Sequence, residues 1–270
     1  MSHSSAESAR SAASRIQDNP AFQFAARTGF AVNGLLHLLI GGIALSVAFG
    51  SGGDADQSGA LQGLASTPGG VFVLWVVAIG LIALGLFQVL ETFLIRGTEK
   101  DAWTDRAKEG GKAIAYLAIG FSAASVALGS GSDSSGQTQS ITATLLSTPG
   151  GVFLVVLLGL GVIAVGVYFI VKGVKKKFLQ DISVPGGKTG RSITTLARLG
   201  HIAKGIVISV VGILFCVAAF TSDPSEATGL DGALKALVDL PLGPAILTVV
   251  ALGLMAYGVY CFARAKYARL

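Results

Sequence analysis

Charged residues are scarce in this 270-residue sequence: Asp, Glu, Lys and Arg together make up only 13% of it, whereas 52% of the residues are apolar. A typical soluble domain carries about 25% charged residues. The composition therefore argues against a water-soluble globular protein and indicates an integral membrane protein.

Cysteine and histidine are also rare, with two and three residues respectively. Both cysteines fall inside apolar segments, where they are too few and too deep for a disulfide framework. With the histidines they form no ligand pattern for zinc, copper or iron. The sequence also lacks a nucleophile-and-base pair and paired carboxylates within one segment. We therefore expect no cofactor, no metal site and no enzymatic activity.

Long apolar runs, in contrast, recur six times along the chain. Each is close to the roughly 20 residues that a helix needs to cross the hydrocarbon core of a membrane. Because a chain that crosses lipid must satisfy its own backbone hydrogen bonds, these runs predict helices. The predicted fold is an all-α integral membrane protein with six transmembrane helices, at approximately Phe30–Gly50, Val71–Ile95, Lys112–Gly129, Gly151–Val171, His201–Phe220 and Gly243–Ala263.

Basic residues lie almost entirely on one side of this topology. Of the 20 Lys and Arg residues, 19 fall in the N-terminal arm, the connectors after the second and fourth segments, the C-terminus and the adjoining helix ends. The loops 51–70, 130–150 and 221–242 hold only Lys235, together with seven acidic residues. Since Lys and Arg stay on the cytoplasmic side, both termini are predicted to be cytoplasmic in a multi-pass plasma-membrane protein. This polarity explains the net charge of +5, so no nucleic-acid partner is expected.

One two-helix unit is written three times in the chain. The seven residues Ser66–Phe72 recur without change 81 positions later as Ser147–Phe153. The helix that follows contains the pattern Gly-x-x-Ala-x-Gly in all three copies, beginning at Gly80, Gly161 and Gly253. A period of roughly 80 to 90 residues therefore covers nearly everything after the N-terminal arm.

The repeat divides the chain into units and predicts their symmetry. The units are a disordered cytoplasmic arm at 1–25, three helical hairpins at 26–97, 98–179 and 197–270, and a basic cytoplasmic linker at 180–196. Since each hairpin returns the chain to the same side, the copies run parallel and are expected to share a pseudo-threefold axis along the membrane normal. Before the second helix of the first two hairpins, Thr67-Pro68 and Thr148-Pro149 predict an N-cap followed by a first-turn proline.

Small residues predict where the helices touch. At 100° per residue around the helix axis, Gly80 and Ala83 lie about 60° apart, whereas Gly85 lies about 140° from Gly80. The small residues therefore lie on two different sides of this helix. We therefore expect a close neighbour on both sides of the second helix of each hairpin. The predicted packing residues are Gly34, Gly41, Gly80, Ala83, Gly85, Gly161, Ala164, Gly166, Gly253, Ala256 and Gly258.

Several stretches of the chain resemble a bacterial membrane family catalogued as domain of unknown function 1206. They are Ala233–Leu237, Pro241–Gly243 and Val250–Gly258, with the pattern from Gly34 to Gly41. The first helix departs from the family pattern by carrying His37 where the second copy has the aromatic Tyr116. The resemblance covers about residues 26–267 and all three repeats. It implies the six-helix, three-repeat fold in a bacterial membrane, and it supplies no catalytic residue.

Polar positions that coincide in the repeats predict a ring at the cytoplasmic mouth of the bundle. One shared position holds Asn33, Lys112 and Lys204, and another holds Glu91, Lys172 and Arg264. Charges at this depth are costly unless they pair or reach the headgroup region, so Glu91 most needs a partner. The hypothesis is that the four cations bind an anion, either a phospholipid headgroup or a phosphate-bearing solute. The alternative is ordinary snorkelling with the positive-inside bias.

Four polar residues, Asn33, His37, Gln88 and Glu91, are candidates for functional positions within the membrane. His37 lies about ten residues into the first helix, on the face of Gly34 and Gly41, with Asn33 one turn away. It is a candidate for a proton relay. The alternative is a neutral histidine whose ring is hydrogen-bonded to a backbone carbonyl or a serine hydroxyl.

These patterns predict a non-enzymatic accessory or scaffold protein. Its expected partners are membrane lipids, with anionic headgroups on the cytoplasmic side, and a membrane-protein partner or a second copy of itself. The alternative is a channel or transporter for a small solute, an anion or a proton along the pseudo-threefold axis, and an intramembrane enzyme comes third. A continuous polar cavity reaching His37 would favour transport, whereas a dry, glycine-packed axis would favour a scaffold.

Overall fold

The computed structural model describes residues 20–94, 100–131 and 133–268. This part of the chain forms nine α-helices and two short 3-10 helices without any β-strand, which confirms the predicted all-α fold there. Each repeat has two long helices with a short one between them. The elements are α2 (Pro20–Ala48), α3 (Gln57–Ala65), α4 (Gly70–Leu94), α5 (Lys100–Ala127), α6 (Ser134–Leu146), α7 (Gly151–Val174), η1 (Lys177–Gln180), α8 (Gly187–Thr221), η2 (Pro224–Glu226), α9 (Gly229–Val238) and α10 (Gly243–Tyr267).

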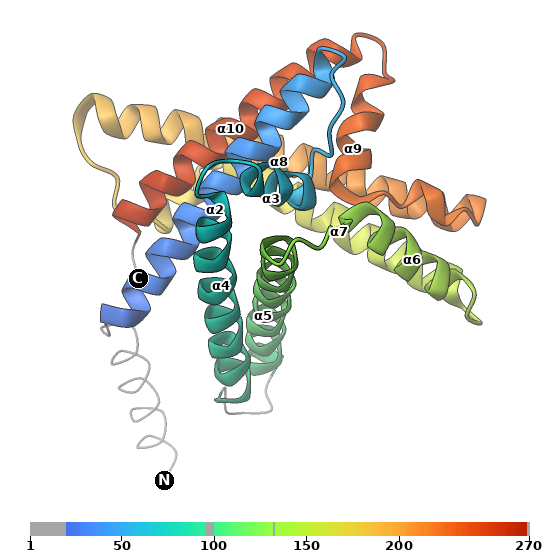
Figure 1. Cartoon of the computed structure of the whole chain (residues 1–270), viewed down its shortest axis with the longest axis horizontal. Coiled ribbons are helices and arrows are strands. Elements are labelled where there is room, and N and C mark those ends of the chain that lie inside the picture. The colour runs from blue at the N-terminus through green and yellow to red at the C-terminus, as the bar shows by residue number, and fades with distance from the viewer. Residues whose placement is uncertain (1–19, 95–99, 132, 269–270) are drawn as a thin grey trace.

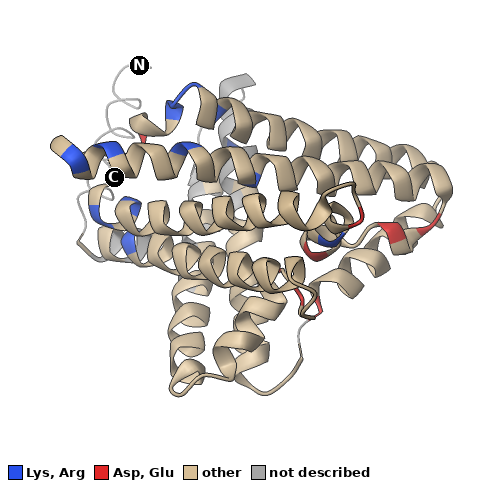
Figure 2. Cartoon of the chain, turned by 90° about the horizontal axis from the view of Figure 1, so that it is seen from above, with Lys and Arg blue, Asp and Glu red and all other residues tan. Residues whose placement is uncertain are grey.

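The long helices identify a multi-pass membrane protein. Among the described residues, four stretches are long and apolar enough to cross a membrane: Arg27–Ala48 in α2, and the whole of α7, α8 and α10. Shorter apolar stretches, Gly70–Ile82 and Ala113–Ala127, lie in α4 and α5. Lys and Arg gather at one end of the helices, and Asp and Glu at the other (Figure 2). We call these ends the basic side, where α7 ends and α8 begins, and the acidic side, where α3, α6 and α9 lie.

The long helices pair between neighbouring repeats rather than within them. α4 packs along α5, α7 along α8, and α10 along α2, which joins the last repeat back to the first. Figure 1 shows α4 and α5 side by side, set apart from the other long helices. Within a repeat, close packing of the two long helices is found in the described residues only for α8 and α10. The hairpin predicted from the sequence is thus not the packing unit, because its close-approach glycines face the neighbouring repeat.

Glycine allows the backbones of these paired helices to touch. A Cβ added to Gly34 would lie 2.8 Å from the carbonyl oxygen of Gly258, and a Cβ added to Gly258 would lie 2.7 Å from that of Gly34. Gly166 and Gly205 face each other in the same way, at 2.7 and 2.6 Å. We call the three contact lines, α2–α10, α4–α5 and α7–α8, the seams.

The seams repeat one geometry at equivalent positions. An added Cβ would meet the side chain of the facing helix at 2.6 Å at Gly41, 2.9 Å at Gly120 and 2.7 Å at Gly212, and the residues it would meet are Met255, Ile82 and Ile163. On the α4–α5 seam, a Cβ on Gly85 would lie 2.7 Å from the side chain of Leu117. Five of the predicted packing residues lie in the seams: Gly34, Gly41, Gly85, Gly166 and Gly258.

The second predicted flank of small residues is filled in one repeat only. Gly253 and Ala256 are buried, and a Cβ on Gly253 would lie 2.3 Å from a side-chain carbon of α8. Gly80, Gly161 and Ala164 are exposed, and no atom lies within 4 Å of a Cβ added to either glycine. The expectation of a neighbour on both sides is therefore wrong for α4 and α7, because only α10 has its repeat partner packed on that flank.

The Ser-Thr-Pro-Gly-Gly motif forms the turn between a short helix and the next long one. Thr67 and Thr148 donate their hydroxyls to carbonyl oxygens three residues earlier, both at 2.7 Å. The predicted role of these threonines as N-caps is therefore wrong, because the hydroxyls bond to the preceding helix. Gly69 and Gly150 follow with φ of 76° and 79°, the left-handed conformation that favours glycine.

The three short helices form a cap on the acidic side. Ser58 of α3 bonds through its hydroxyl to the hydroxyl and the N–H of the first residue of α6. Ser135 of α6 donates to the carbonyl of Thr228, just before α9, at 3.0 Å. The N–H of Ala55, before α3, donates to the carboxylate of Asp231 in α9 at 2.9 Å. These bonds connect the outer segments of all three repeats.

Two predicted boundaries change on the basic side. α8 begins at Gly187, so the predicted linker 180–196 largely belongs to this helix. The reason is packing: the connector is anchored by Phe178 of η1, which is buried in one cluster with Ile193 and Ala197 of α8. α2 begins at Pro20, inside the predicted arm, where proline suits the first helical position. The rest of that arm, 1–19, lies outside the described residues.

Glycines inside and outside a seam should differ in their tolerance of a side chain. We expect Gly212→Ala to lower the free energy of unfolding by about 1 to 3 kcal/mol through overpacking. The physical reason is that its Cβ would lie 2.6 Å from the carbonyl oxygen of Gly159. Gly161→Ala adds the same methyl group to the exposed face of α7 and should leave stability unchanged or raised. Thermal unfolding of both variants in one detergent measures the difference, and equal losses would contradict the seam.

The cap should respond to pH through Asp56. Asp56 accepts a hydrogen bond from the Gly59 N–H at 2.9 Å, and burial, with Asp231 and Asp54 nearby, raises the pKa of its carboxyl. Because folding disfavours the ionised form, the protein loses stability as the pH rises through this raised pKa. Asp56→Asn keeps the N-cap acceptor and removes the charge. Its melting temperature should exceed that of the wild type at pH 7, by a margin that shrinks as the pH falls to about 4.

Asp133→Asn is the matched control for this exchange. Asp133 caps α6 by accepting from the Gly136 N–H at 2.8 Å, but from an exposed position. The control should show no gain in melting temperature at pH 7. A lower melting temperature of Asp56→Asn at pH 7, or a margin of the same size at pH 4, would show that burial of the Asp56 carboxylate costs nothing.

Candidate functional site

A cavity of about 710 Å³ lies among the three seams. All six long helices contribute to its wall, and Gln57 of α3 and Leu230 of α9 contribute from the cap. Most of the lining is apolar, with side chains such as Leu36, Leu81 and Val207. We call it the central cavity.

The polar residues of the central cavity include five that the sequence singled out. Three come from the predicted intramembrane residues and two from the predicted cationic ring: Asn33, His37, Gln88, Lys204 and Arg264. Asn33 and His37 lie on α2, Gln88 on α4, Lys204 on α8 and Arg264 on α10. The pairing of α10 with α2 and the packing of α8 against α10 bring most of them together.

The two cations contact aromatic rings instead of carboxylates. The ammonium group of Lys204 lies 4.4 Å from the ring centre of Tyr257 and 5.2 Å from that of Phe169. The guanidinium carbon of Arg264 lies 4.2 Å from the ring centre of Phe30. Within the described part of the chain, neither cation has an ion-pair partner, and the buried Nε of Arg264 has no hydrogen-bond acceptor. Such contacts stabilise a cation in part and leave its hydrogen-bond donors available.

His37 lies in the same cavity and bonds to its own helix. Its Nδ1 lies 2.8 Å from the carbonyl oxygen of Asn33, one turn earlier. Because a carbonyl only accepts hydrogen bonds, Nδ1 carries the proton and Nε2 is the acceptor of the neutral ring. The ring of Tyr257 packs against His37 at 4.7 Å between centres, so Tyr257 touches both His37 and Lys204.

The predicted ring of four cations is only partly assembled at the central cavity. Lys172 turns away from it and forms an ion pair with Asp181 at 2.6 Å. This pair is possible because the connector after α7 folds back onto that helix through η1. The side chains of Ala83, Glu91 and Lys112 lie outside the described residues.

An aromatic cluster beside the cavity was not anticipated. His201, the first residue of the fifth predicted span, is buried in the protein, and its Nδ1 lies 2.7 Å from the carbonyl oxygen of Ala197. Its ring stacks on Phe178 and meets Tyr257 and Tyr260, each with ring centres 5.1 Å apart. The spacing of Tyr257 and Tyr260 on one helix was a usable signal, but the partner Phe178 comes from the connector, which no periodicity marks.

The arrangement suits an anionic ligand with an apolar body. Its two cations can donate to an acidic group, and the apolar wall excludes water around the rest of the ligand. The volume lies within the range of about 300 to 1,000 Å³ that is typical of small-molecule sites.

Comparisons with known proteins agree with the repeat structure. A family profile described as Domain of Unknown Function (DUF1206) matches residues 28–94, 109–176 and 199–268, one segment for each repeat. The uncharacterized protein YxxB of Bacillus subtilis (strain 168) is 32% identical over 248 residues, which cover 89% of each chain. No solved structure matches. The predicted three tandem repeats and the resemblance to this family are thereby confirmed.

Proposed function

The chain belongs to the DUF1206 family, and on that premise we propose that it is a non-enzymatic membrane protein that holds an anionic lipid in its central cavity. Its role is that of an accessory or scaffold component of the bacterial plasma membrane. The observation that carries the proposal is the presence of Lys204 and Arg264, without ion-pair partners among the described residues, in an otherwise mainly apolar cavity.

The proposal includes six membrane spans with both termini in the cytoplasm. α4 and α5 contain the apolar stretches Gly70–Ile82 and Ala113–Ala127, and with 25 and 28 residues they are about 38 and 42 Å long, which allows a crossing of about 30 Å. The positive-inside rule assigns the basic side to the cytoplasm. The equivalent glycine contacts of the three seams support a pseudo-threefold relation between the repeats.

The energetics of buried charge favour a bound anion. A cation within a membrane is costly unless it pairs or reaches the headgroup region, and aromatic contacts offset only part of that cost. An acidic headgroup would pair with Lys204 and Arg264 on the basic side. Its acyl chains would lie along the apolar wall, where they replace water.

The outer surface supports a role beside lipids or partner proteins. Phe72 on α4 and Phe153 on α7 are equivalent residues of two repeats, with 73% and 70% of their surface exposed. An apolar surface of this kind packs against acyl chains, a membrane-protein partner or a second copy of the chain.

Removing the two cations tests lipid binding. Lys204→Met keeps the aliphatic stem and Arg264→Gln keeps a polar group of reduced length. We expect the double variant to lose one bound phosphatidylglycerol, whose affinity falls at least about tenfold, because charge-assisted hydrogen bonds are lost. Native mass spectrometry of the full chain with phosphatidylglycerol or phosphatidylcholine measures the change, and thermal unfolding checks that the variant folds.

The control for this variant removes two cations elsewhere. Lys175 and Lys188 are exposed, and they lie neither in the wall of the central cavity nor in a seam. Lys175→Gln/Lys188→Gln should therefore change phosphatidylglycerol affinity by less than about twofold. A folded Lys204→Met/Arg264→Gln variant that binds as many phosphatidylglycerol molecules as the wild type, with wild-type affinity, would overturn the proposal.

The extent of the central cavity favours a second candidate function, a path for a small solute, an anion or a proton. The cavity lining runs from Arg264 through His37 to Gln57 of the cap. A proton path predicts that proteoliposomes with an internal pH-sensitive dye show a flux that His37→Leu abolishes and Lys175→Gln/Lys188→Gln leaves intact. A wild-type flux of protons and halides equal to that of empty vesicles would reject this candidate.

A further inference from the structure

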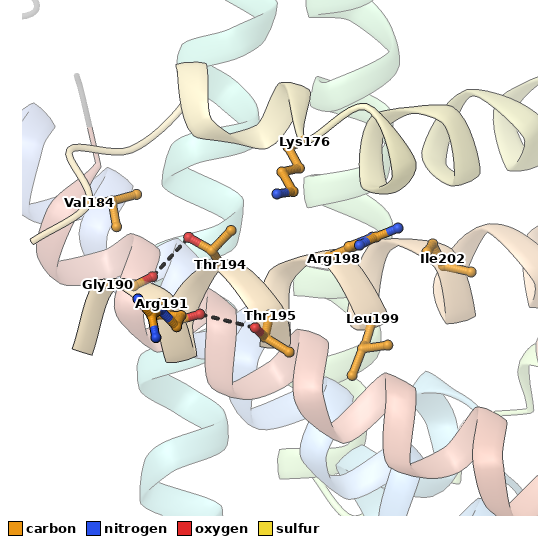
Figure 3. Close-up of a pocket in the computed structure, with 9 residues that line it drawn as sticks. All are labelled: Lys176, Val184, Gly190, Arg191, Thr194, Thr195, Arg198, Leu199 and Ile202. Atoms are coloured by element: carbon orange, nitrogen blue, oxygen red, sulfur yellow. Dashed lines mark hydrogen bonds between the residues drawn. The ribbon is translucent and has the colours of Figure 1, made fainter. Parts of the chain in front are cut away.

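A second cavity opens on the basic side, between the end of α7 and the first turns of α8. It measures about 480 Å³ and shares no lining residue with the central cavity. Its wall comes from Lys176 after α7, Val184 of the connector, and α8 from Gly190 to Ile202 (Figure 3). We call it the connector pocket.

Three cations line the connector pocket. Arg191 and Arg198 are seven residues apart, about two helical turns, and therefore lie on one side of α8. Lys176 extends toward α8 from the opposite wall (Figure 3). For the described residues, the structure gives none of the three a carboxylate partner. The pocket therefore concentrates positive charge that no described protein anion neutralises.

The two threonines between the arginines already donate their hydroxyl protons to backbone carbonyls. Thr194 donates its hydroxyl to the carbonyl of Gly190 at 2.8 Å, and Thr195 donates to the carbonyl of Arg191 at 3.1 Å (Figure 3). Since each hydroxyl has one proton, the N–H groups of the cations are the donors left for a ligand. Arg binds phosphate oxygens through two parallel N–H groups, and Lys binds them as a point charge.

Lys176 occupies a conformation that its side chain disfavours. Its φ is 53°, in the left-handed region where glycine commonly ends a helix. Backbone strain of this kind clusters at ligand sites, where it positions a group for binding. Here it places an ammonium group on the wall opposite the two arginines.

The depth of the pocket indicates the source of the phosphate. α8 has 35 residues and is about 52 Å long, so about 20 Å of it extends beyond the hydrocarbon core. The pocket lies along the first turns of this helix, on the basic side. Leu199, with 53% of its surface exposed, and Ile202 form an apolar border next to the cations. Cationic and apolar side chains are therefore adjacent at this site.

We propose that the connector pocket binds the phosphodiester of an anionic phospholipid, at a site separate from the central cavity. The phosphate contacts Lys176, Arg191 and Arg198, and the acyl chains pass over Leu199 and Ile202. Cations near a membrane attract anionic lipids in general. Here three cations on two facing walls line one pocket, which concentrates that attraction at one place.

The test compares two charge-matched double variants. Native mass spectrometry of the full chain measures the affinity for phosphatidylglycerol and for phosphatidylcholine. Arg191→Gln/Arg198→Gln should lose one bound phosphatidylglycerol, whose affinity falls at least about tenfold, with phosphatidylcholine binding unchanged. Lys175→Gln/Lys188→Gln removes two exposed cations outside the pocket and should change the affinity by less than about twofold.

The same comparison in the Lys204→Met/Arg264→Gln background separates this site from the central cavity. Loss of phosphatidylglycerol binding through Arg191→Gln/Arg198→Gln should persist there, whether or not the central cavity binds lipid. The wild-type number and affinity of bound phosphatidylglycerol molecules in Arg191→Gln/Arg198→Gln, or an equal loss in the control pair, would overturn the connector pocket as a site.

Lys176→Gly distinguishes binding from folding. Glycine relieves the left-handed strain, so the melting temperature should equal or exceed that of the wild type while phosphatidylglycerol binding falls. A fall in both, or in neither, would show that Lys176 does not serve the pocket as proposed.

Inorganic phosphate distinguishes the two sources of a phosphate group. An excess of it should leave bound phosphatidylglycerol in place, because the lipid also gains its acyl-chain contacts. Displacement of the lipid by inorganic phosphate would overturn the phospholipid assignment in favour of a soluble phosphate compound.

Discussion

Direct backbone contact between the last helix of one repeat and the first helix of the next is the constraint on which the remaining structure depends. Lipid offers little hydrophobic drive for helices to associate, so close packing must hold them together. Gly34 against Gly258 and Gly166 against Gly205 provide that packing where no side chain separates the helices. Because α10 returns to α2, the same contact also joins the two ends of the chain.

The central cavity follows from this pairing. With the strongest contacts between repeats, the flanks that carry Gly80 and Gly161 have no close neighbour, and only the α8–α10 contact fills the equivalent flank. The helix pairs leave a space between them, the central cavity, whose wall takes residues from all six long helices. Lys204 and Arg264 face that space with aromatic rings beside them and without a described carboxylate.

The acidic and basic sides of the protein differ in whether their charged side chains have partners within the protein. On the acidic side, Asp231 accepts from the Ala55 N–H and from Lys235, the latter at 2.6 Å, so its carboxylate is paired within the cap. On the basic side, the connector pairs Lys172 with Asp181 but leaves the cations of the connector pocket without such a partner among the described residues. Electrostatics therefore favour an anionic partner on the basic side, for the central cavity and for the connector pocket alike.

The sequence by itself determined the helical character, the three repeats, the charge polarity and five of the polar residues that line the central cavity. These features depend on local or periodic properties of the sequence: the length of the apolar segments and the sequence identity between the repeats. A polar residue such as His37 is conspicuous in an apolar segment because placing it in a membrane costs free energy. Only the tertiary structure decided which helices pair, since Gly80, Gly161 and Gly253 have the same local pattern and only Gly253 finds a neighbour. It also decided that Phe178 anchors the connector and that His201 is buried. The physical reason is that a helix period specifies which face is small or apolar, whereas the element that covers this face depends on contacts distant in the sequence.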